Sequence, residues 1–441
     1  MKEKYDLVIV GAGPAGIMAA KTAGSGGLKV ALIERKKNIS RIHRSCGGVL
    51  NVNEPTFGEV VTFDEDKNEL IFTNSGLKIK YDGPHQDIFG FSIYSPNGLK
   101  LEFGSCAQLR KDPMKNRLGL SVSKEQLLQQ LLEETEDSEV SIFPNTNVCS
   151  VKKELSSVLV ETDEGTTFES TLVIAADGIN SRIARILGLN KSRSFYGSSR
   201  TATLEIEGTS CPEPEAFIFV ITPRCIASMI PIAQKNCYDV SVSTYRRDEK
   251  PLELINYFMR EDPVYRHWFK NSRVLEHKTA CVVNLMNPME KPYKDQVLFI
   301  GDACWRREMS NVGSICTGWK AGEIIIEALK NGNPNEKGMQ PYLDWYQENY
   351  YGPEGKRKQG GRDFTDYLDP EDIDYLVGLP EVQFPQTMDI FKVINYIGKT
   401  YSELMTQINE ERPNVMNNLV MIRENMEEDM QKRISWGFRN V

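Results

Sequence analysis

A glycine-rich turn near the N-terminus is the first part of this chain whose residues could bind a ligand. An apolar run over residues 5–10 predicts a buried strand, and the residues after it predict a tight turn and the start of a helix. The residues of this turn that are expected to contact a ligand are Gly11, Gly13, Pro14, Ala15 and Gly16. The first glycine allows the turn, the second lets a pyrophosphate approach the backbone, and the third lets the helix pack closely on the strand. The free N–H groups at the start of the helix would then face the pyrophosphate.

An acidic residue follows the next apolar run. Residues 30–33 predict a second strand that ends at Glu34, 23 positions after Gly11. A carboxylate at this place can bond the ribose hydroxyls of an adenosine, and Arg35 beside it is a second candidate contact. Strand, turn, helix, strand and acid together predict a dinucleotide site. They leave open whether the nucleotide is FAD or NAD(P).

Composition places the chain among ordinary globular proteins, with 441 residues of which 40% are hydrophobic and 26% charged. The formal net charge of −8 argues against nucleic-acid binding. No apolar stretch approaches the roughly 18 residues that span a bilayer, and no signal-peptide core precedes the first strand, so we expect a cytoplasmic protein. The nine cysteines lack the spacing of a zinc or iron–sulfur site, so no metal is expected, and their odd number suits a reducing compartment.

The remaining pattern predicts a second sheet and a helical C-terminal region. Alternating runs between residues 60 and 105, and again between 195 and 285, indicate strands and hairpins. Ser123 and the residues after it predict a capped helix over 124–135. Further strands are predicted at 148–153, 157–162, 166–169, 171–175, 200–206, 216–221, 226–231, 239–244 and 296–300. Further helices are predicted at 318–330, 387–408 and 414–433. A solvated loop is predicted at 350–359.

Two later segments bear on the nucleotide. Residues 177–188 have the form DGxxSxxRxxxG after a strand and begin with Asp177 and Gly178. Residues 297–303 form a strand that ends in Gly301 and Asp302, before a loop and a helix. With all three segments in order, the chain resembles the FAD-dependent group that includes geranylgeranyl reductases and aromatic hydroxylases of the p-hydroxybenzoate hydroxylase kind. The resemblance covers roughly residues 5–330 and implies FAD as the cofactor.

In that reading each segment contacts a different part of the cofactor. Gly301 lets the backbone approach the flavin and ribityl chain, and Asp302 can accept a hydrogen bond from a ribityl hydroxyl. The N–H groups around residues 310–314, including those of Gly313 and Ser314, can face the flavin ring as a helix begins.

Residues 44–50 favour the reductase branch of this group. The stretch Arg44-Ser-Cys46-Gly-Gly is similar to a segment after the second strand in prenyl reductases, and residues 301–324 align with their pattern without a gap. We expect Cys46 near the flavin as proton donor or substrate positioner, and Arg44 to hold a phosphate or a flavin oxygen. A buried thiol and a surface charge are the alternatives for these two residues.

The sequence also departs from the reductase pattern. Residues 227–229 replace an aromatic strand, Met309 replaces a proline, and Val312-Gly-Ser314 replaces a Gly-x-Gly. Ser123 stands where an arginine is expected, with Lys124 as its substitute. Trp305 is predicted to be a packed side chain, and Arg306 and Arg307 surface charges. No role is assigned to the histidines, although His43 is close to Cys46 in sequence.

The expected fold is α/β, a Rossmann-type FAD-binding domain of the glutathione reductase kind with an inserted antiparallel sheet and a helical C-terminal region. The FAD-binding part is assigned to 1–60, 105–190 and 285–332, the substrate part to 61–104 and 191–284, and the helical region to 333–441. We expect a carbon–carbon double bond of a hydrophobic, isoprenoid-like substrate to be reduced by hydride from flavin N5. The alternatives are a monooxygenase using NAD(P)H and O2, a dehydrogenase that passes electrons to a quinone or an electron-transfer flavoprotein, and a flavin-binding sensor without turnover.

The electron donor stays open between NAD(P)H and a ferredoxin, since no second GxGxxG is present. For the apolar stripes of the C-terminal helices the alternatives are core or dimer contacts, a lid over a lipid, and a peripheral membrane contact.

Overall fold

The computed structural model describes residues 3–46, 48–136, 138–305, 309–352 and 367–422. Its first sheet has eight strands and carries the N-terminal motif at the carboxyl ends of its parallel strands. The strand order is β11 (Val140–Phe143), β2 (Val30–Ile33), β1 (Glu3–Val10), β14 (Thr167–Ala175), β13 (Val158–Thr162) and β12 (Val148–Lys153). Beside β14 lies β21 (Val297–Phe299), which also pairs with β20 (Tyr293–Lys294). Strands β11, β2, β1, β14 and β21 are parallel.

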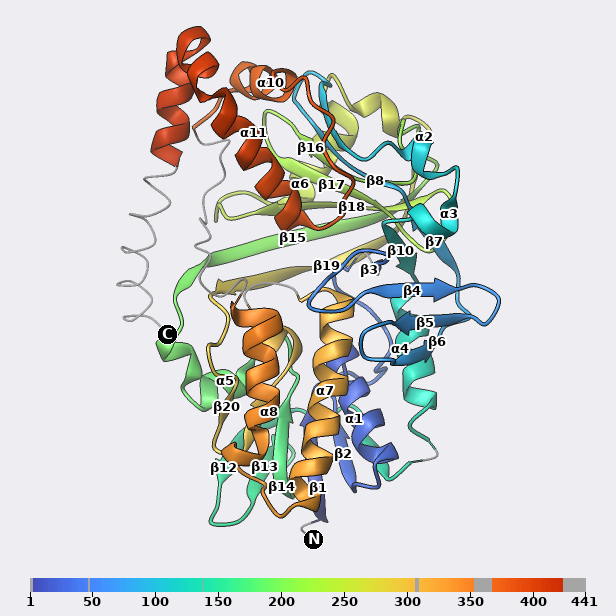
Figure 1. Ribbon diagram of the computed structural model, residues 1–441, viewed down its shortest axis with the longest axis vertical. Helices are drawn as coiled ribbons and strands as arrows, with labels where there is room; N and C mark the ends of the chain where they lie inside the picture. The colour runs from blue at the N-terminus through green and yellow to red at the C-terminus, as the bar shows by residue number, and fades with distance from the viewer. Residues whose placement is uncertain (1–2, 47, 137, 306–308, 353–366, 423–441) are drawn as a thin grey trace.

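A second sheet of seven strands lies across the upper half of the molecule (Figure 1). Its order is β19 (Arg273–Met286), β15 (Phe195–Glu207), β18 (Cys237–Thr244), β17 (Ile226–Pro231), β16 (Ala216–Ile221), β8 (Gly90–Tyr94) and β9 (Lys100–Phe103). All pairs are antiparallel except β16 with β8. Two three-stranded sheets complete the β structure: β3 (Val49–Asn51), β10 (Gly119–Val122) and β7 (His85–Ile88), and β4 (Val61–Asp64), β5 (Glu69–Phe72) and β6 (Lys78–Lys80).

Helices cover both sheets. Near the first sheet lie α1 (Pro14–Ser25), α4 (Lys124–Glu133), α5 (Arg182–Ile186), α7 (Asn311–Lys330) and α8 (Glu336–Tyr346). Near the second lie the short α2 (Cys106–Leu109) and α3 (Pro113–Asn116), α6 (Pro251–Asn256), α10 (Pro370–Gly378) and α11 (Ile390–Glu411). The Rossmann-type arrangement, the inserted sheet and the helical C-terminal region confirm the predicted fold class.

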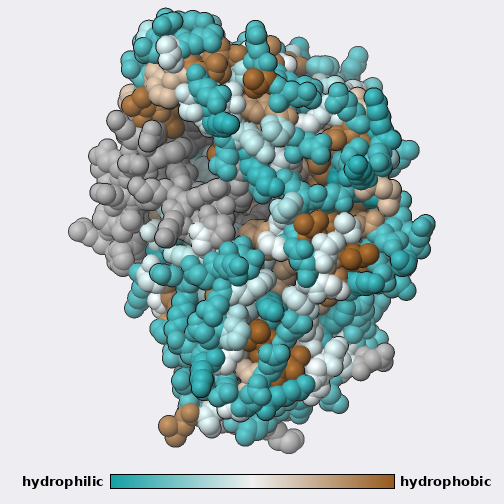
Figure 2. All heavy atoms as spheres, in the orientation of Figure 1, coloured by the Kyte–Doolittle hydropathy of each residue, from teal (hydrophilic) through white to brown (hydrophobic). Residues whose placement is uncertain are grey.

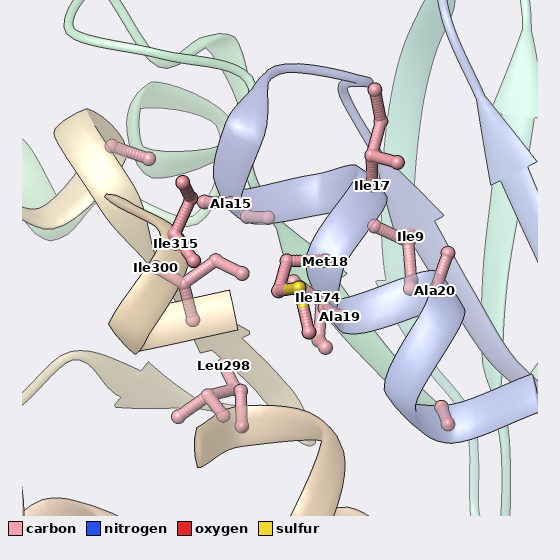
Figure 3. Close-up of a cluster of buried hydrophobic side chains, with 14 of the residues drawn as sticks. Ile9, Ala15, Ile17, Met18, Ala19, Ala20, Ile174, Leu298, Ile300 and Ile315 are labelled. Atoms are coloured by element: carbon pink, nitrogen blue, oxygen red, sulfur yellow. The ribbon is translucent and has the colours of Figure 1, made fainter. Parts of the chain in front are cut away.

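The main core lies between the first sheet and helix α7, with helix α1 packed between them. Side chains of α1, β1, β14, β21 and α7 meet there, as Figure 3 shows for Met18, Ile174 and Ile315. Helix α7 can come this close because it carries glycines: a Cβ on Gly318 would lie 2.2 Å from the carbonyl oxygen of Ala15. A Cβ on Gly322 would lie 2.6 Å from Cβ of Thr22. The close packing of α1 on α7 therefore requires glycine at these two positions of α7.

Most predicted elements are present, with several corrected boundaries. Helix α7 begins at Asn311, as the expected helix start around 310–314 implies and earlier than the predicted 318–330, because Ser310 caps it by accepting from the N–H of Gly313. The runs 166–169 and 171–175 are one strand, β14. Strand β15 is longer than the predicted 200–206, and the predicted 124–135 helix ends at Glu133.

The C-terminal part was predicted with less accurate limits. Helix α11 runs over Ile390–Glu411 rather than 387–408, and helical structure continues from 413 to 422. Most of the predicted loop at 350–359, and residues 423–433 of the last predicted helix, lie outside the described residues. Residues 347–351 form a π-helical turn.

Helices α10 and α11 pack against one end of the second sheet. Asp374 of α10 accepts from the N–H of Asn97 at 2.9 Å and from the hydroxyl of Ser95. Side chains of α11 pack with Phe217 and Phe219 of β16 in the same cluster. Figure 2 shows hydrophobic side chains gathered at this end of the molecule, where Ile394 is 57% exposed.

Replacing Gly318 with alanine tests the packing of α1 on α7. The new Cβ would overlap the backbone of Ala15, so we expect a loss of about 1–3 kcal/mol in the free energy of unfolding, measured by urea titration. Gly398→Ala is the matched control, because Gly398 is an exposed glycine of α11 with no atom within 4 Å of its Cβ position. Alanine there should leave stability unchanged or raise it by up to about 1 kcal/mol. Equal effects of the two substitutions would contradict this account of the core.

Candidate functional site

The glycine turn lies between β1 and α1 and has no room for side chains at two of its positions. Gly11 has φ +103°, and a Cβ there would lie 2.3 Å from the carbonyl oxygen of Ala176. A Cβ on Gly16 would lie 1.8 Å from the carbonyl oxygen of Gly11. At Gly13, by contrast, no atom lies within 4 Å of the Cβ position. The turn is therefore tightly packed toward the protein and open at Gly13, beside the N-terminus of α1, as a pyrophosphate requires.

Glu34 ties the end of β2 to this turn. Its Oε2 accepts from the N–H of Ala12 at 2.8 Å, and its Oε1 accepts from the N–H of Lys36 at 2.9 Å. The carboxylate is 8% exposed, whereas Arg35 is an exposed residue. Burial lowers the pKa of Lys36, partly offset by the charge of Glu34. Carboxylate oxygens can accept further hydrogen bonds, so the position suits the ribose contact that the sequence predicts.

Asp177 and Gly178 follow β14 at the same edge of the sheet, because Ala175 pairs with Val10 of β1. Oδ2 of Asp177 accepts from the N–H of Ile183 at 3.1 Å, while its buried Oδ1 has no hydrogen-bond partner among the described residues. Burial raises the pKa of this carboxyl. Gly178 has φ +83° and open space at its Cβ position. A buried oxygen without a donor, beside an open glycine, fits a ligand that brings a hydroxyl or amide group.

Gly301 and Asp302 follow β21, the neighbour of β14, where Phe299 pairs with Ala175. Gly301 has φ +59°, and its N–H donates to the hydroxyl of Thr317 at 3.2 Å. Oδ1 of Asp302 accepts from the N–H of Met309 at 2.7 Å, so this acid also closes the loop before α7. The hydroxyl of Ser314 donates to the carbonyl oxygen of Met309 at 3.0 Å.

Two of the predicted flavin contacts at the start of α7 are already used inside the protein. The N–H of Gly313 donates to the hydroxyl oxygen of Ser310 at 3.2 Å, and the N–H of Ser314 donates to the carbonyl oxygen of Ser310 at 3.1 Å. A Cβ on Gly313 would lie 2.8 Å from the ring of Phe57. Gly313 is therefore required for packing, whatever contact it makes with a ligand.

Buried aromatic rings support the loop from behind. Tyr350 stacks on Phe57 with ring centroids 4.8 Å apart and on Tyr346 at 5.7 Å. The hydroxyl of Tyr350 donates to the carbonyl oxygen of Gly313 at 3.3 Å, and that of Tyr346 to the carbonyl oxygen of Cys304 at 3.4 Å. Trp305 is fully buried among them, as the sequence predicts, whereas Arg306 and Arg307 lie outside the described residues.

The segment 44–49 lies where helix α4, helix α7 and the second sheet meet. Sγ of half-buried Cys46 accepts a hydrogen bond from Nζ of Lys124 at 3.3 Å. The side-chain amide of Asn311 donates to the carbonyl oxygen of Val49 at 3.0 Å, which joins this segment to the start of α7. Arg44 and His43 are exposed. Cys46 is thus bonded to α4, while Val49, three residues later, is bonded to the start of α7.

One face of the second sheet carries half-buried residues, and the bond between Thr203 and Ser45 joins it to this segment. Near Ser45, on β15 and β18, the half-buried residues of this face carry hydroxyl groups. On β16 they are apolar, and β17 between them contributes residues of both kinds. The polar members are Thr201, Ser228, Ser241 and Ser243, with buried Thr203 between them, and the apolar members are Phe217, Phe219, Ile226 and Ile230. None of these residues was among the predicted site residues, although their alternation along each strand could have indicated a shared face.

Within the described residues there is no group of three histidine, cysteine or acidic side chains that could hold a metal. In the same part of the chain, no helix is long and apolar enough to cross a membrane.

A family model and several named proteins are similar to this chain in sequence. The family described as pyridine nucleotide-disulphide oxidoreductase matches residues 5–81, the segment with the glycine turn and Glu34. The digeranylgeranylglycerophospholipid reductase 1 of Methanococcoides burtonii is 24% identical over 420 residues, covering 92% of this chain and 94% of its own. The digeranylgeranylglycerophospholipid reductase 1 of Methanosphaera stadtmanae is 26% identical over 357 residues, covering 78% and 81%.

Solved structures share the fold. A geranylgeranyl bacteriochlorophyll reductase-like protein from Thermoplasma acidophilum superposes with a TM-score of 0.70 at 18% identity, over 93% of this chain and all of that one. The p-nitrophenol 4-monooxygenase of Pseudomonas putida gives 0.56 at 16% identity, over 97% and 99%.

Two acids at the sheet edge provide a test of the cofactor contacts. Glu34→Ala removes the acceptor of two backbone N–H groups and the predicted ribose contact, and Asp302→Ala removes the predicted ribityl contact. We expect each variant to bind FAD at least about tenfold more weakly, which is about 1.4 kcal/mol, and to lose visible flavin absorbance during purification. Asp374→Ala removes an equally buried carboxylate in α10 and should keep its flavin. Full flavin content in both acidic variants would show that the cofactor lies elsewhere.

Proposed function

We propose that this chain, a FAD-dependent oxidoreductase of the superfamily that contains geranylgeranyl reductases and aromatic hydroxylases, reduces carbon–carbon double bonds of a hydrophobic isoprenoid lipid. The observation that carries the proposal is the similarity to digeranylgeranylglycerophospholipid reductases along almost the whole length of both chains. The half-buried sheet face that Thr203 joins to Ser45 would be the surface on which such a substrate lies.

Bound FAD would supply the hydride from its reduced N5. The turn at Gly11–Gly16, with Glu34 and Arg35, would hold its adenosine and pyrophosphate. Asp177, Gly178, Gly301 and Asp302 would hold the ribityl chain and the flavin, with Gly313 and Ser314 at the start of α7. The orphaned Oδ1 of Asp177 and the open space at Gly13 and Gly178 support this arrangement.

The substrate would lie between the flavin and the second sheet. Phe217 and Phe219 are half-buried on that sheet and pack with side chains of α11, so they offer an apolar surface for an isoprenoid tail. Exposed apolar residues of α11, such as Ile394 and Met405, suit a contact with the membrane surface that holds the lipid or with a second copy of the chain.

Cys46 would act as proton donor or substrate positioner, and Arg44 would hold a phosphate or a flavin oxygen. The hydrogen bond from Lys124 holds the thiol of Cys46 at the N-terminus of α4. Electrons would come from NAD(P)H or a ferredoxin.

The second candidate is a monooxygenase that uses NAD(P)H and O2. The fold similarity to p-nitrophenol 4-monooxygenase favours it. Met309 does not separate the two candidates, because it replaces a proline of both patterns, and the reductase is preferred for the similarity along almost the whole chain.

Oxygen dependence separates the two candidates. We expect holoenzyme reduced by dithionite without oxygen to be reoxidised by a digeranylgeranyl glycerophospholipid, with saturation of the double bonds detected by mass spectrometry. The fully saturated lipid is the control and should leave the flavin reduced. If turnover strictly requires O2, the reductase proposal fails.

Cys46→Ala tests the thiol. The hydrogen bond with Lys124 lies outside the turn and the acids that would hold FAD, so flavin content should be unchanged. Anaerobic reoxidation by the unsaturated lipid should slow by about 10-fold or more, as for loss of a positioned group. Cys149→Ala, at an exposed thiol of β12, is the control. An unchanged rate in the Cys46 variant would show that this residue has no role in the reaction and is only a packed thiol.

A further inference from the structure

A chain of three hydroxyls joins the second sheet to the segment beside Cys46. The hydroxyl of Thr203 on β15 lies 2.6 Å from Oγ of Ser45 and 2.6 Å from Oγ of Ser241 on β18. Thr203 is 1% exposed, whereas Ser45 and Ser241 at the two ends are half-buried. The middle of the chain is therefore shielded from water, whereas the residues at its two ends are partly exposed.

The direction of these hydrogen bonds follows from counting protons. In the bond to Ser45 the hydroxyl of Thr203 is the donor. A hydroxyl has one proton to donate, so Ser241 must donate in the bond that it shares with Thr203. Ser45 accepts in its bond with Thr203, so its own hydroxyl proton is not used within the row of three hydroxyls and can be donated to another group. Hydroxyl chains of this kind pass a proton when each oxygen receives one as it gives one.

Ser45 and Cys46 are neighbours in sequence with different partners. Ser45 is bonded to the sheet through Thr203, whereas the thiol of Cys46 faces Lys124 of α4. Among the described residues, Ser45 is thus the end of a chain of hydroxyl groups, whereas Cys46 is bonded to the ammonium of Lys124.

We propose that Ser241, Thr203 and Ser45 form a relay that delivers the proton needed to saturate the double bond. The inference rests on the proposed reductase function, in which one alkene carbon takes a hydride and the other takes a proton. Ser45 gives its proton to the second carbon and takes one from Thr203. Thr203 takes one from Ser241, and water restores the proton of Ser241. Two electrons and one proton arrive as hydride, one proton arrives through the relay, and no other oxidant or reductant is required. Cys46 then positions the substrate.

The same strand supplies a matched control. Thr201 lies two residues from Thr203 on the same face, and its hydroxyl pairs with that of Ser243 at 2.6 Å. Thr201→Val and Thr203→Val thus each break one cross-strand hydroxyl pair, but only the second breaks the connection to Ser45.

The experiment measures anaerobic reoxidation of dithionite-reduced holoenzyme by the unsaturated lipid in H2O and in D2O. In Thr203→Val and Ser45→Ala we expect the rate to fall about 100-fold, as for loss of a general acid, with a larger solvent isotope effect than in the unchanged protein. Thr201→Val changes the same sheet face but leaves the bond to Ser45 intact, so we expect it to lower the rate at least about tenfold less than Thr203→Val does. Thr203→Ser, which keeps the hydroxyl, should restore most of the rate.

Deuterium placement in the product is the readout that a purely structural role would not change. The unchanged protein, Thr201→Val and Cys46→Ala should place solvent deuterium on one face of the carbon, whereas Thr203→Val should give both faces, because water then replaces the relay. Flavin content and melting temperature should be equal in the two valine variants. Equal rates and equal stereochemistry in Thr203→Val and Thr201→Val would overturn the relay. If the unsaturated lipid fails to reoxidise even the unchanged protein, the reductase function itself is wrong.

Discussion

The approach of backbone to backbone around helix α1 is the constraint on which the rest of the structure depends. The turn before α1 leaves no space for a Cβ at Gly11 or Gly16, and α7 packs on α1 without one at Gly318. Because α1 and α7 are held this closely, their N-termini lie at the same edge of the sheet, next to the ends of β1, β14 and β21. A helix N-terminus attracts anionic and hydrogen-bond-accepting groups, so the same packing that makes the core also makes the ligand edge.

At that edge, Glu34 and Asp302 have hydrogen-bond partners within the protein, whereas one carboxylate oxygen of Asp177 has none among the described residues. Glu34 and Asp302 accept from backbone N–H groups and so fix the loops in which they lie. Asp177 keeps one buried oxygen without a partner among the described residues, at the cost that burial imposes on its charged form. A group left in this state is explained most simply by a ligand that completes it, and the neighbouring open glycine provides the space.

Sequence reasoning succeeded where one short segment determines its own structure. The strand–turn–helix at residues 5–25 and the strands of the second sheet follow from local periodicity and glycine positions, and the fold class followed from three such segments in order. The apolar pattern placed the start of α7 too late, at 318, because the first turn contains Gly313 and Ser314 rather than an apolar stripe. The helix start that the resemblance implies around 310–314 is confirmed, and Ser310 caps it. Strand β19 was not predicted as a strand of its own within the strand-rich region 195–285. Its long pairing with β15 depends on the partner strand and contains register shifts.

The contacts between distant segments could not be read from the sequence. The bond between Ser45 and Thr203 joins residues 158 positions apart, and that between Lys124 and Cys46 joins residues 78 apart. Both arise because Ser45 and Cys46 lie between the second sheet and helix α4. A Cβ on Gly48, at φ +62°, would lie 2.4 Å from the carbonyl oxygen of Val122, and the N–H of Val122 donates to the carbonyl oxygen of Gly48 at 3.0 Å. This link fixes the segment against β10, so that Ser45 bonds to the sheet while Cys46 bonds to α4. Gly48, two residues after the thiol, is thus required by packing independently of any family pattern. Its close approach to Val122 leaves Ser45 bonded to the second sheet and Cys46 bonded to α4.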